Sequence, residues 1–222
     1  MADSFNEDDD LRRLKDWWKQ NGTALVLGVG AGVVAIAGWQ WWQARVENQA
    51  YSGATAYQAF SESLESGAAQ ADTVEMLETI RDEFGATPYP ARASLDLANH
   101  YVEQRQLDKA ASLLAWVAAN ANAEPLRLLA RGRQARVLWA QGEDEAALKL
   151  LSTDVPPAYT SLFREIEGDI QLSAGRLDQA RQAYAVALDA LPEGADAAPL
   201  RTKLESAGGR VPSAPNNNQE VS

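Results

Sequence analysis

The side chains in this sequence that could do chemistry are too few or too scattered to form a catalytic site. The chain has no cysteine and a single histidine, His100. This excludes thiol catalysis, disulfide bonds and cysteine-based zinc sites, and it nearly excludes histidine triads and multi-histidine metal sites. No glycine-rich phosphate loop follows a strand, because no strand is evident. We therefore expect a protein that is not an enzyme, with no catalytic residue, no metal and no cofactor.

The carboxylates are numerous, but they are spread along predicted helix faces, where a solvated surface is the ordinary role. The net charge is −11, and the first 22 residues, with six acidic and four basic side chains, account for −2 of it. Nucleic-acid binding needs a basic face to neutralise phosphates. The composition therefore predicts no nucleic-acid partner, and His100 reads as a solvated or packed side chain.

An apolar segment at residues 23–42 is the element that would place the rest of the chain relative to a membrane. Residues 24–42 read ALVLGVGAGVVAIAGWQWW, with Gln40 as the one polar side chain. At about 1.5 Å per residue this segment spans roughly 30 Å, the thickness of the hydrocarbon core of a lipid bilayer. Helices buried in soluble proteins are rarely apolar all round over this length. We predict a transmembrane helix, bracketed by tryptophans of the kind found at membrane interfaces: Trp17, Trp18, Trp39, Trp41 and Trp42.

The orientation of this helix follows from its basic flank. Four basic residues lie within residues 12–19, whereas Arg45 alone lies in the twenty residues after the span. By the positive-inside rule, residues 1–22 form a cytoplasmic segment and the C-terminal domain lies outside. A cleaved signal peptide is the competing interpretation, because Ala35-Ile36-Ala37 resembles a cleavage site. The long, partly acidic leading segment and the bulky tryptophans after the span favour a retained anchor.

Small residues recur every four positions within the span, at Ala24, Gly28 and Gly32. Such a face lets a second membrane helix approach closely, so Gly28 and Gly32 are predicted to contact one. Ordinary glycine enrichment in membrane helices explains the same pattern equally well.

Beyond the span, apolar residues continue at helical spacing over 43–66, with a bend expected near Gly53. After a loop at 67–72, a second helix at 73–84 ends where Gly85 suits a C-cap. These two helices are expected to form an antiparallel pair.

The remainder of the chain repeats itself. Three gap-free segments begin at Gln104, Gln141 and Ala174, and their shared alanine recurs after 37 and then 33 residues. This period is typical of tetratricopeptide (TPR) repeats. The middle unit departs from the pattern because Ala135 replaces a helix glycine and its second helix should end early.

The fold class is therefore all-α, with one N-terminal transmembrane helix followed by a TPR-like solenoid of helical hairpins at 43–207. The tail at 208–222 is rich in Gly, Pro and Asn and is predicted to be disordered. The expected helices cover residues 89–104, 107–120, 124–141, 143–153, 157–174, 177–191 and a cap at 197–207.

TPR units bind polypeptide segments on the concave face that the first helix of each unit lines. Trp139 is the best candidate for an exposed aromatic anchor, although packing between helices would explain it equally well. Leu95 and Asp96 occupy positions where the carboxylate clamp of chaperone-docking TPR domains needs other side chains, so that activity is not predicted. The candidate partner-binding residues are Arg92, Leu95, Asn99, Val102, Leu129, Arg136, Trp139, Leu162, Asp169 and Leu172.

The arrangement resembles a known family, the ancillary SecYEG translocon subunits (YfgM-type proteins). The resemblance runs from about residue 7 to residue 205 and is specific in its order. It is carried by Asn21-Gly22 before the apolar run, the Gly-Trp exit from it, and the segments ASLDLA (93–98), LLARGRQARV (128–137) and EGDIQLSAGR (167–176).

This resemblance implies an inner-membrane protein with a cytoplasmic N-terminus and a periplasmic TPR domain. It implies association with the SecYEG translocon and with a PpiD-like membrane-anchored periplasmic chaperone, and transfer of newly translocated substrate polypeptides to periplasmic chaperones. It also implies an influence of the cytoplasmic segment on an envelope-stress regulator. The alternative is a TPR scaffold for another cell-envelope assembly complex.

Overall fold

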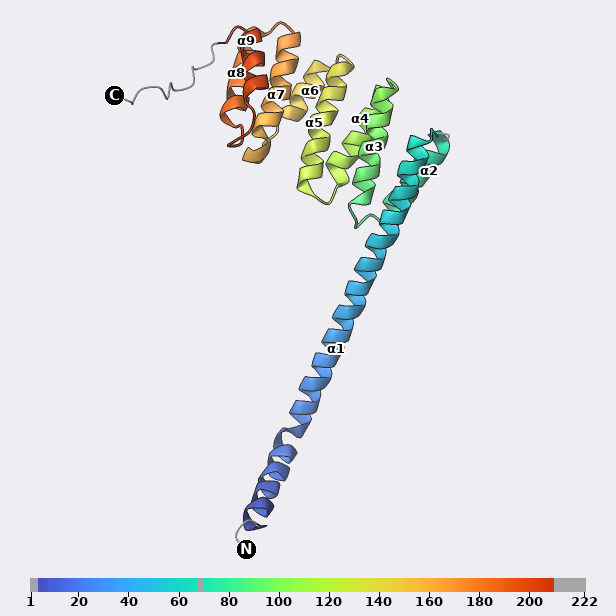
Figure 1. Cartoon of the computed structure of the whole chain (residues 1–222), viewed down its shortest axis with the longest axis vertical. Helices are drawn as coiled ribbons and strands as arrows, with labels where there is room; N and C mark the ends of the chain where they lie inside the picture. The colour runs from blue at the N-terminus through green and yellow to red at the C-terminus, as the bar shows by residue number, and fades with distance from the viewer. Residues whose placement is uncertain (1–3, 68–69, 210–222) are drawn as a thin grey trace, which may run out of the picture. The chain divides into compact units, whose positions relative to one another are not determined.

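The computed structural model describes residues 4–67 and 70–209, and all its regular secondary structure there is helical (Figure 1). The chain divides into two compact units, Met1–Ser52 and Gly53–Ser222. The predicted all-α class, with an N-terminal apolar helix and a TPR-like solenoid, is confirmed. The predicted disordered tail lies outside the described residues except for Gly208 and Gly209.

The N-terminal helix α1 (Ser4–Glu65) carries the apolar segment. It is the one helix of the described residues that is long and apolar enough to cross a membrane. Its large apolar side chains are exposed, with Leu27 68% and Val34 72% accessible. Such a large exposed apolar surface calls for a covering of lipid or of another protein. A helix also satisfies its own backbone hydrogen bonds, as the interior of a bilayer requires.

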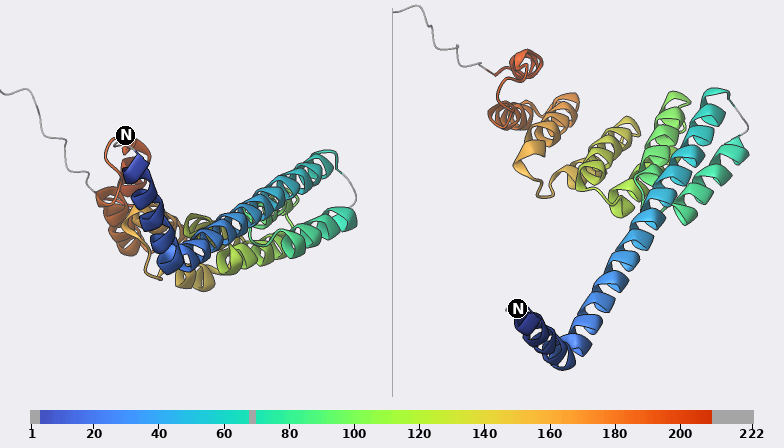
Figure 2. Two further views of the ribbon diagram at one scale, coloured as in Figure 1. Left: turned by 90° about the horizontal axis from the view of Figure 1, so that it is seen from below. Right: turned by 60° about the horizontal axis from the view of Figure 1, so that its bottom comes forward.

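The second unit is a series of helical hairpins, shown from further directions in Figure 2. From α2 to α9 each helix packs on the next, and α3 also contacts α5, as α5 contacts α7. The first helices of successive hairpins therefore form one layer, which we call the A-face, and the second helices form the B-face. The helices are α2 (Gln70–Glu83), α3 (Tyr89–Glu103), α4 (Leu107–Asn120), α5 (Glu124–Ala140), α6 (Asp144–Leu151), α7 (Pro157–Ser173), α8 (Leu177–Asp189) and α9 (Ala198–Ser206).

Each of these helices was predicted, and the middle hairpin does end early, at Leu151. Two local expectations are wrong. Helix α2 begins at Gln70, so the end of the predicted loop is helical, with Asp72 in the first turn where a carboxylate is favourable. Gly85 does not adopt the left-handed conformation of a glycine C-cap. Gly53 lies within α1, where a Cβ would lie 2.9 Å from the Tyr89 ring, so its missing side chain serves packing; the bend near it stays a prediction.

The hairpin turns within the three repeats share one geometry. Arg105, Gly142 and Gly175 all have positive φ, at 60°, 82° and 72°. In each turn the next residue donates its backbone N–H to the carbonyl five residues back, as Gln106 does to Tyr101 at 2.8 Å. This left-handed C-cap suits glycine and strains any other residue. The first repeat therefore carries strain at Arg105 that the other two avoid.

Close packing within the last hairpin depends on Gly168 of α7. A Cβ at this position would lie 2.4 Å from Cε1 of Tyr184, a side chain of α8 that is fully buried. Tyr184 and Ala187 also pack with Leu200 and Leu204 of α9 in one apolar cluster. The small residue at Gly168 therefore lets α7 and α8 cross closely, and the cluster explains how α9 caps the array.

Candidate functional site

Two adjoining cavities on the A-face form the site that best fits a polypeptide partner. One, of about 740 Å³, lies among the C-terminal part of α1, α3 and α5, and the other, of about 240 Å³, lies between α3 and α5 with Leu114 of α4 beneath. They share Leu95, Asn99 and Arg133. We call the two together the A-face groove.

The floor of the A-face groove is apolar and fixed by the core. Leu95, Ala98 and Val137 are at most 6% exposed and belong to the same apolar cluster. Val102 is 37% exposed at the edge of the groove. The helical spacing of Leu95, Ala98 and Val102 places them on one stripe of α3, so a bound segment would meet a preformed surface.

The acidic side chains of α3 along this groove already have partners. The Tyr57 hydroxyl donates to Asp96 Oδ2 at 2.7 Å, which ties α1 to α3. Burial, and then the hydrogen bond to Asp96, raise the pKa of Tyr57 above its usual value. Asn99 Nδ2 donates to Glu103 Oε1 at 2.9 Å. These hydrogen bonds hold the α3 carboxylates against their own neighbours.

By contrast, two arginines along the groove are uncommitted, meaning that their side chains have no hydrogen-bond or ion-pair partner among the described residues. These are Arg133 and Arg136, which are exposed on α5. Arginine presents five donors in a planar fork that matches carboxylate groups. The pair therefore offers charged donors beside an apolar floor, the combination that orients a ligand while the floor binds it.

The structure brings only some of the predicted partner-binding residues together. Leu95, Asn99, Val102 and Arg136 line the A-face groove. Arg92 is exposed on α3 but does not line it. Leu129 packs against the apolar cluster that contains Leu95, and Leu162 and Trp139 pack against a cluster that contains Phe163 and Ile166. Leu172 packs against the cluster around Tyr184. Their role in partner binding stays a prediction.

Trp139 is partly buried and its indole is already engaged. Its Nε1 donates to the Ser173 hydroxyl at 3.0 Å, which ties the end of α5 to the end of α7. An indole N–H has one donor, so a partner would have to displace Ser173 to use it. The arrangement favours a packing role for Trp139.

Asp169 lies in a separate polar cluster that joins α7, α8 and α9. It accepts from the Tyr184 hydroxyl at 2.8 Å and from Lys203 Nζ at 2.8 Å, and Lys203 also donates to Glu165 at 2.6 Å. Burial, and then the hydrogen bond to Asp169, raise the pKa of Tyr184. Burial lowers the pKa of Lys203, but its bonds to Asp169 and Glu165 outweigh this and raise it. Only 18% of the Asp169 side chain is exposed, so its evident role is to fasten the capping helix.

Arg133 was not among the predicted residues, nor were Tyr57 and Ser61 near the end of α1, which also line the A-face groove. The spacing of Arg133 and Arg136, three residues apart on one helix, was a readable signal. Tyr57 gave no such signal, because its helical spacing fits a core residue equally well.

The structure also locates His100, Gly28 and Gly32. His100 lines the larger cavity of the A-face groove, with its Nε2 2.7 Å from Gln104 Nε2. The described residues contain no cluster of three or more His, Asp or Glu side chains placed to hold a metal. In the first unit, a Cβ added at Gly28 or Gly32 would meet nothing within 4 Å, so space for a helix contact exists there. That contact stays a prediction.

Comparisons with known proteins agree with this architecture. A tetratricopeptide repeat-like domain model matches residues 15–209. An ancillary SecYEG translocon subunit of Escherichia coli strain K12 is 33% identical over 179 residues, which are 81% of this chain and 85% of the relative. Proteins of the same name from Haemophilus influenzae and Neisseria gonorrhoeae are 25% and 26% identical, over 83% and 87% of this chain and 89% and 92% of their own lengths. No solved structure gives a significant match.

The family model covers both the apolar helix and the repeats, and the matches with the relatives extend over most of each relative. The chain belongs to the family of ancillary SecYEG translocon subunits, built on a tetratricopeptide repeat-like domain.

Proposed function

We propose that this chain is a non-enzymatic subunit of the Sec translocon that receives newly translocated polypeptides in the A-face groove. The observation that carries the proposal is the groove itself, in which an apolar floor lies beside two uncommitted arginines, Arg133 and Arg136. A chain emerging from a translocon is unfolded and exposes apolar side chains together with charged ones. Such a groove would hold an apolar side chain and a neighbouring carboxylate at once.

The proposed location is the bacterial inner membrane, with the N-terminal segment in the cytoplasm and the repeats in the periplasm. The exposed apolar part of α1 supports a membrane anchor. The basic residues of the N-terminal flank support the orientation, since such residues are retained on the cytoplasmic side. Membership in the family of ancillary SecYEG translocon subunits supports association with SecYEG.

The proposed next step is transfer of the bound polypeptide to a PpiD-like chaperone anchored in the same membrane. Two proteins anchored in one bilayer meet at a high effective concentration, so a weak and reversible groove is sufficient. A groove of moderate size that is open to solvent suits brief binding better than storage.

Photocrosslinking in native membranes tests the proposal. A photoreactive amino acid at Val102 in the A-face groove should form adducts with a translocating polypeptide, with SecYEG subunits or with the PpiD-like chaperone. The matched control is the same amino acid at Val186, which is 40% exposed on α8, against 37% for Val102. Equal adducts at both positions, or adducts only with proteins of another envelope complex, would contradict the proposal and favour a scaffold elsewhere.

Charge reversal tests the role of the arginines. Arg133→Glu with Arg136→Glu should reduce adducts from Val102 several-fold. The control pair Lys149→Glu with Arg201→Glu makes the same change in net charge at exposed positions of α6 and α9. An equal loss in both variants would show that net charge, rather than the groove, governs binding.

A further inference from the structure

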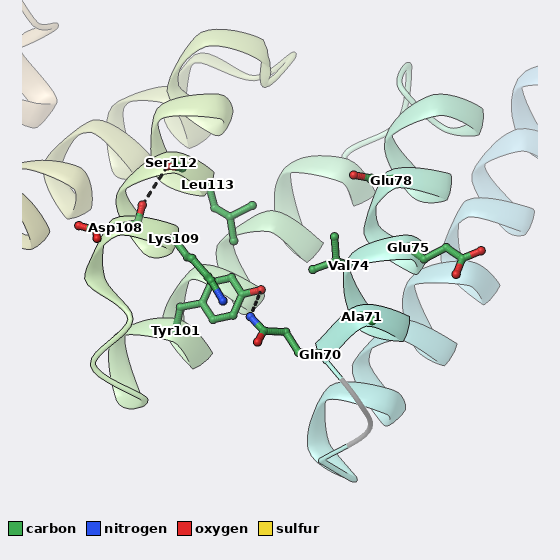
Figure 3. A pocket seen from close by; sticks show the side chains of 10 residues that line it. All are labelled: Gln70, Ala71, Val74, Glu75, Glu78, Tyr101, Asp108, Lys109, Ser112 and Leu113. Carbon is green, nitrogen blue, oxygen red and sulfur yellow. Dashed lines mark hydrogen bonds between the residues drawn. The ribbon is translucent and has the colours of Figure 1, made fainter.

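A second groove lies on the opposite layer of the repeat unit, between the B-face helices α2 and α4 (Figure 3). Its volume is about 890 Å³, larger than either cavity of the A-face groove. We call it the B-face groove. Its lining residues are Gln70, Ala71, Val74, Glu75, Glu78, Tyr101, Asp108, Lys109, Ser112 and Leu113.

The floor of the B-face groove is apolar. Val74 of α2 and Leu113 of α4 are partly buried against the apolar cluster that contains Leu95, and they face each other across the gap, with the buried Tyr101 of α3 beside them. At one end, Gln70 Nε2 donates to the Tyr101 hydroxyl at 2.8 Å and joins α2 to α3. The groove is therefore bounded by two helices and closed at one end.

The rims of this groove are acidic. Glu75 and Glu78 are exposed on the α2 rim, and no ion pair of either occurs in the described part of the chain. Asp108 stands on the α4 rim, where it accepts from Gln141. Like charges three or four residues apart on a helix repel one another, so an opposing cation would stabilise α2.

The two cations nearest these rims are held over aromatic rings rather than beside the carboxylates. Lys109 Nζ lies 5.3 Å from the centre of the Tyr101 ring. The Arg81 guanidinium lies 3.8 Å above Trp116 and donates to the Ser94 hydroxyl. Glu78 and Arg81 attract one another, but neither cation forms an ion pair with a rim carboxylate among the described residues. Three carboxylates and one lysine line the groove, so charge complementarity favours a basic partner.

The shape decides which kind of basic partner fits. The groove is bounded by helices and offers no strand edge, so an extended segment would find no backbone partners for its own N–H and C=O groups. A helix satisfies these groups internally and can lay an apolar stripe into a groove between two other helices.

We propose that the B-face groove docks a basic amphipathic helix of a partner protein. Its apolar stripe covers Val74 and Leu113, while lysine or arginine side chains on its edge reach the exposed carboxylates of Glu75 and Glu78 on the α2 rim. This surface is separate from the A-face groove, so one subunit holds a substrate and a helical partner at the same time.

The test uses the full chain in nanodiscs of uncharged lipid, so that a basic peptide does not bind the bilayer. The probe is a fluorescein-labelled 18-residue amphipathic helix of Leu, Ala and Lys. Two further peptides are compared, one with Glu in place of every Lys and one with the same composition but scrambled periodicity. Fluorescence anisotropy at about 0.15 M salt measures affinity, and hydrogen exchange with mass spectrometry locates the bound region.

We expect the basic amphipathic helix to bind and to protect α2 and α4. Glu75→Lys with Glu78→Lys should weaken binding about tenfold or more, because two attractions become repulsions. The control pair Asp189→Lys with Glu193→Lys changes net charge equally at exposed positions of the last hairpin and should have little effect.

Several results would overturn the proposal. The basic helix could fail to bind at millimolar concentration, or the acidic or scrambled peptide could bind equally well. Hydrogen exchange could show protection of the A-face helices instead of α2 and α4, or both charge-reversal pairs could weaken binding equally. Self-association of the chain that the Glu75/Glu78 reversal abolishes would make a second copy the occupant. The A-face proposal is untouched by any of these, since its readout is crosslinking at Val102.

Discussion

Replacing Gly168 by alanine should destabilise the last hairpin, although the same change normally stabilises a helix. Alanine gains about 1 kcal/mol over glycine in a helix interior. At this position, however, the new Cβ would lie 2.4 Å from Cε1 and 2.5 Å from Cδ1 of Tyr184, which is fully buried. Neither backbone nor ring has room to yield without separating α7 from α8.

The magnitude follows from what must move. Overpacking costs about 1–3 kcal/mol. Displacing the ring also strains the 2.8 Å hydrogen bond from Tyr184 to Asp169, a bond to a charged group worth about 1.5–3 kcal/mol. After the helical gain of alanine is subtracted, we expect a net loss of about 2 kcal/mol.

Gly132→Ala on α5 is the matched control. The nearest atom to a Cβ there is Ile166 Cδ1 at 3.3 Å, the far end of a flexible side chain that can shift by a few tenths of an ångström. This variant should be neutral or slightly more stable, because the helical gain of alanine is retained.

Hydrogen exchange in the full chain measures the effect locally, which matters because repeat arrays open unit by unit. Amides of α7 and α8 should exchange about 30-fold faster in Gly168→Ala than in the wild type. In a Tyr184→Leu background the alanine should be tolerated, since the clash is gone. Exchange in Gly168→Ala no faster than in Gly132→Ala would refute the packing argument.

Three further predictions concern other features of the repeat unit. Arg105→Gly should raise the free energy of unfolding of the first repeat by about 0.5–1 kcal/mol, measured by chemical denaturation, because glycine relieves the strain at φ 60°. Arg81→Lys should lower that free energy by about 1–2 kcal/mol in the same assay, because an ammonium replaces a planar guanidinium stacked 3.8 Å from Trp116; no change would mean that the stacking contributes nothing. The stability of α7–α9 should be constant from neutral pH to about 10 and fall above it. The ordinary pKa values are 10.0 for Tyr184 and 10.5 for Lys203, and the fold raises both. Each group therefore contributes fully to the folding stability below its ordinary pKa, and this contribution is lost as the pH rises through the raised pKa of the folded state. Hydrogen exchange corrected for its intrinsic pH dependence measures this fall, and Lys203→Met should make it shallower.

Several features follow from the sequence because they depend on local pattern. A continuous apolar run specifies a long helix with no polar face, and the order of neighbours in the chain is enough to recognise it. The repeat period and the punctuating prolines specify hairpins, and the observed helix ends lie within three residues of those expected. The local error at Gly85 arises because a glycine after a helix looks the same in the sequence whether or not it adopts the left-handed C-cap conformation.

The sequence by itself determined the apolar anchor, the helical class and the repeat, because each depends on the periodicity of side chains along a single helix. Only the tertiary structure decided which charges remain available. It placed Asp169 against Tyr184 and Lys203, and Trp139 against Ser173, while leaving Arg133 and Arg136 uncommitted beside an apolar floor. It also opened the B-face groove between α2 and α4. The physical reason is that pairing and burial depend on which helices meet, and residues tens of positions apart meet only in the folded chain.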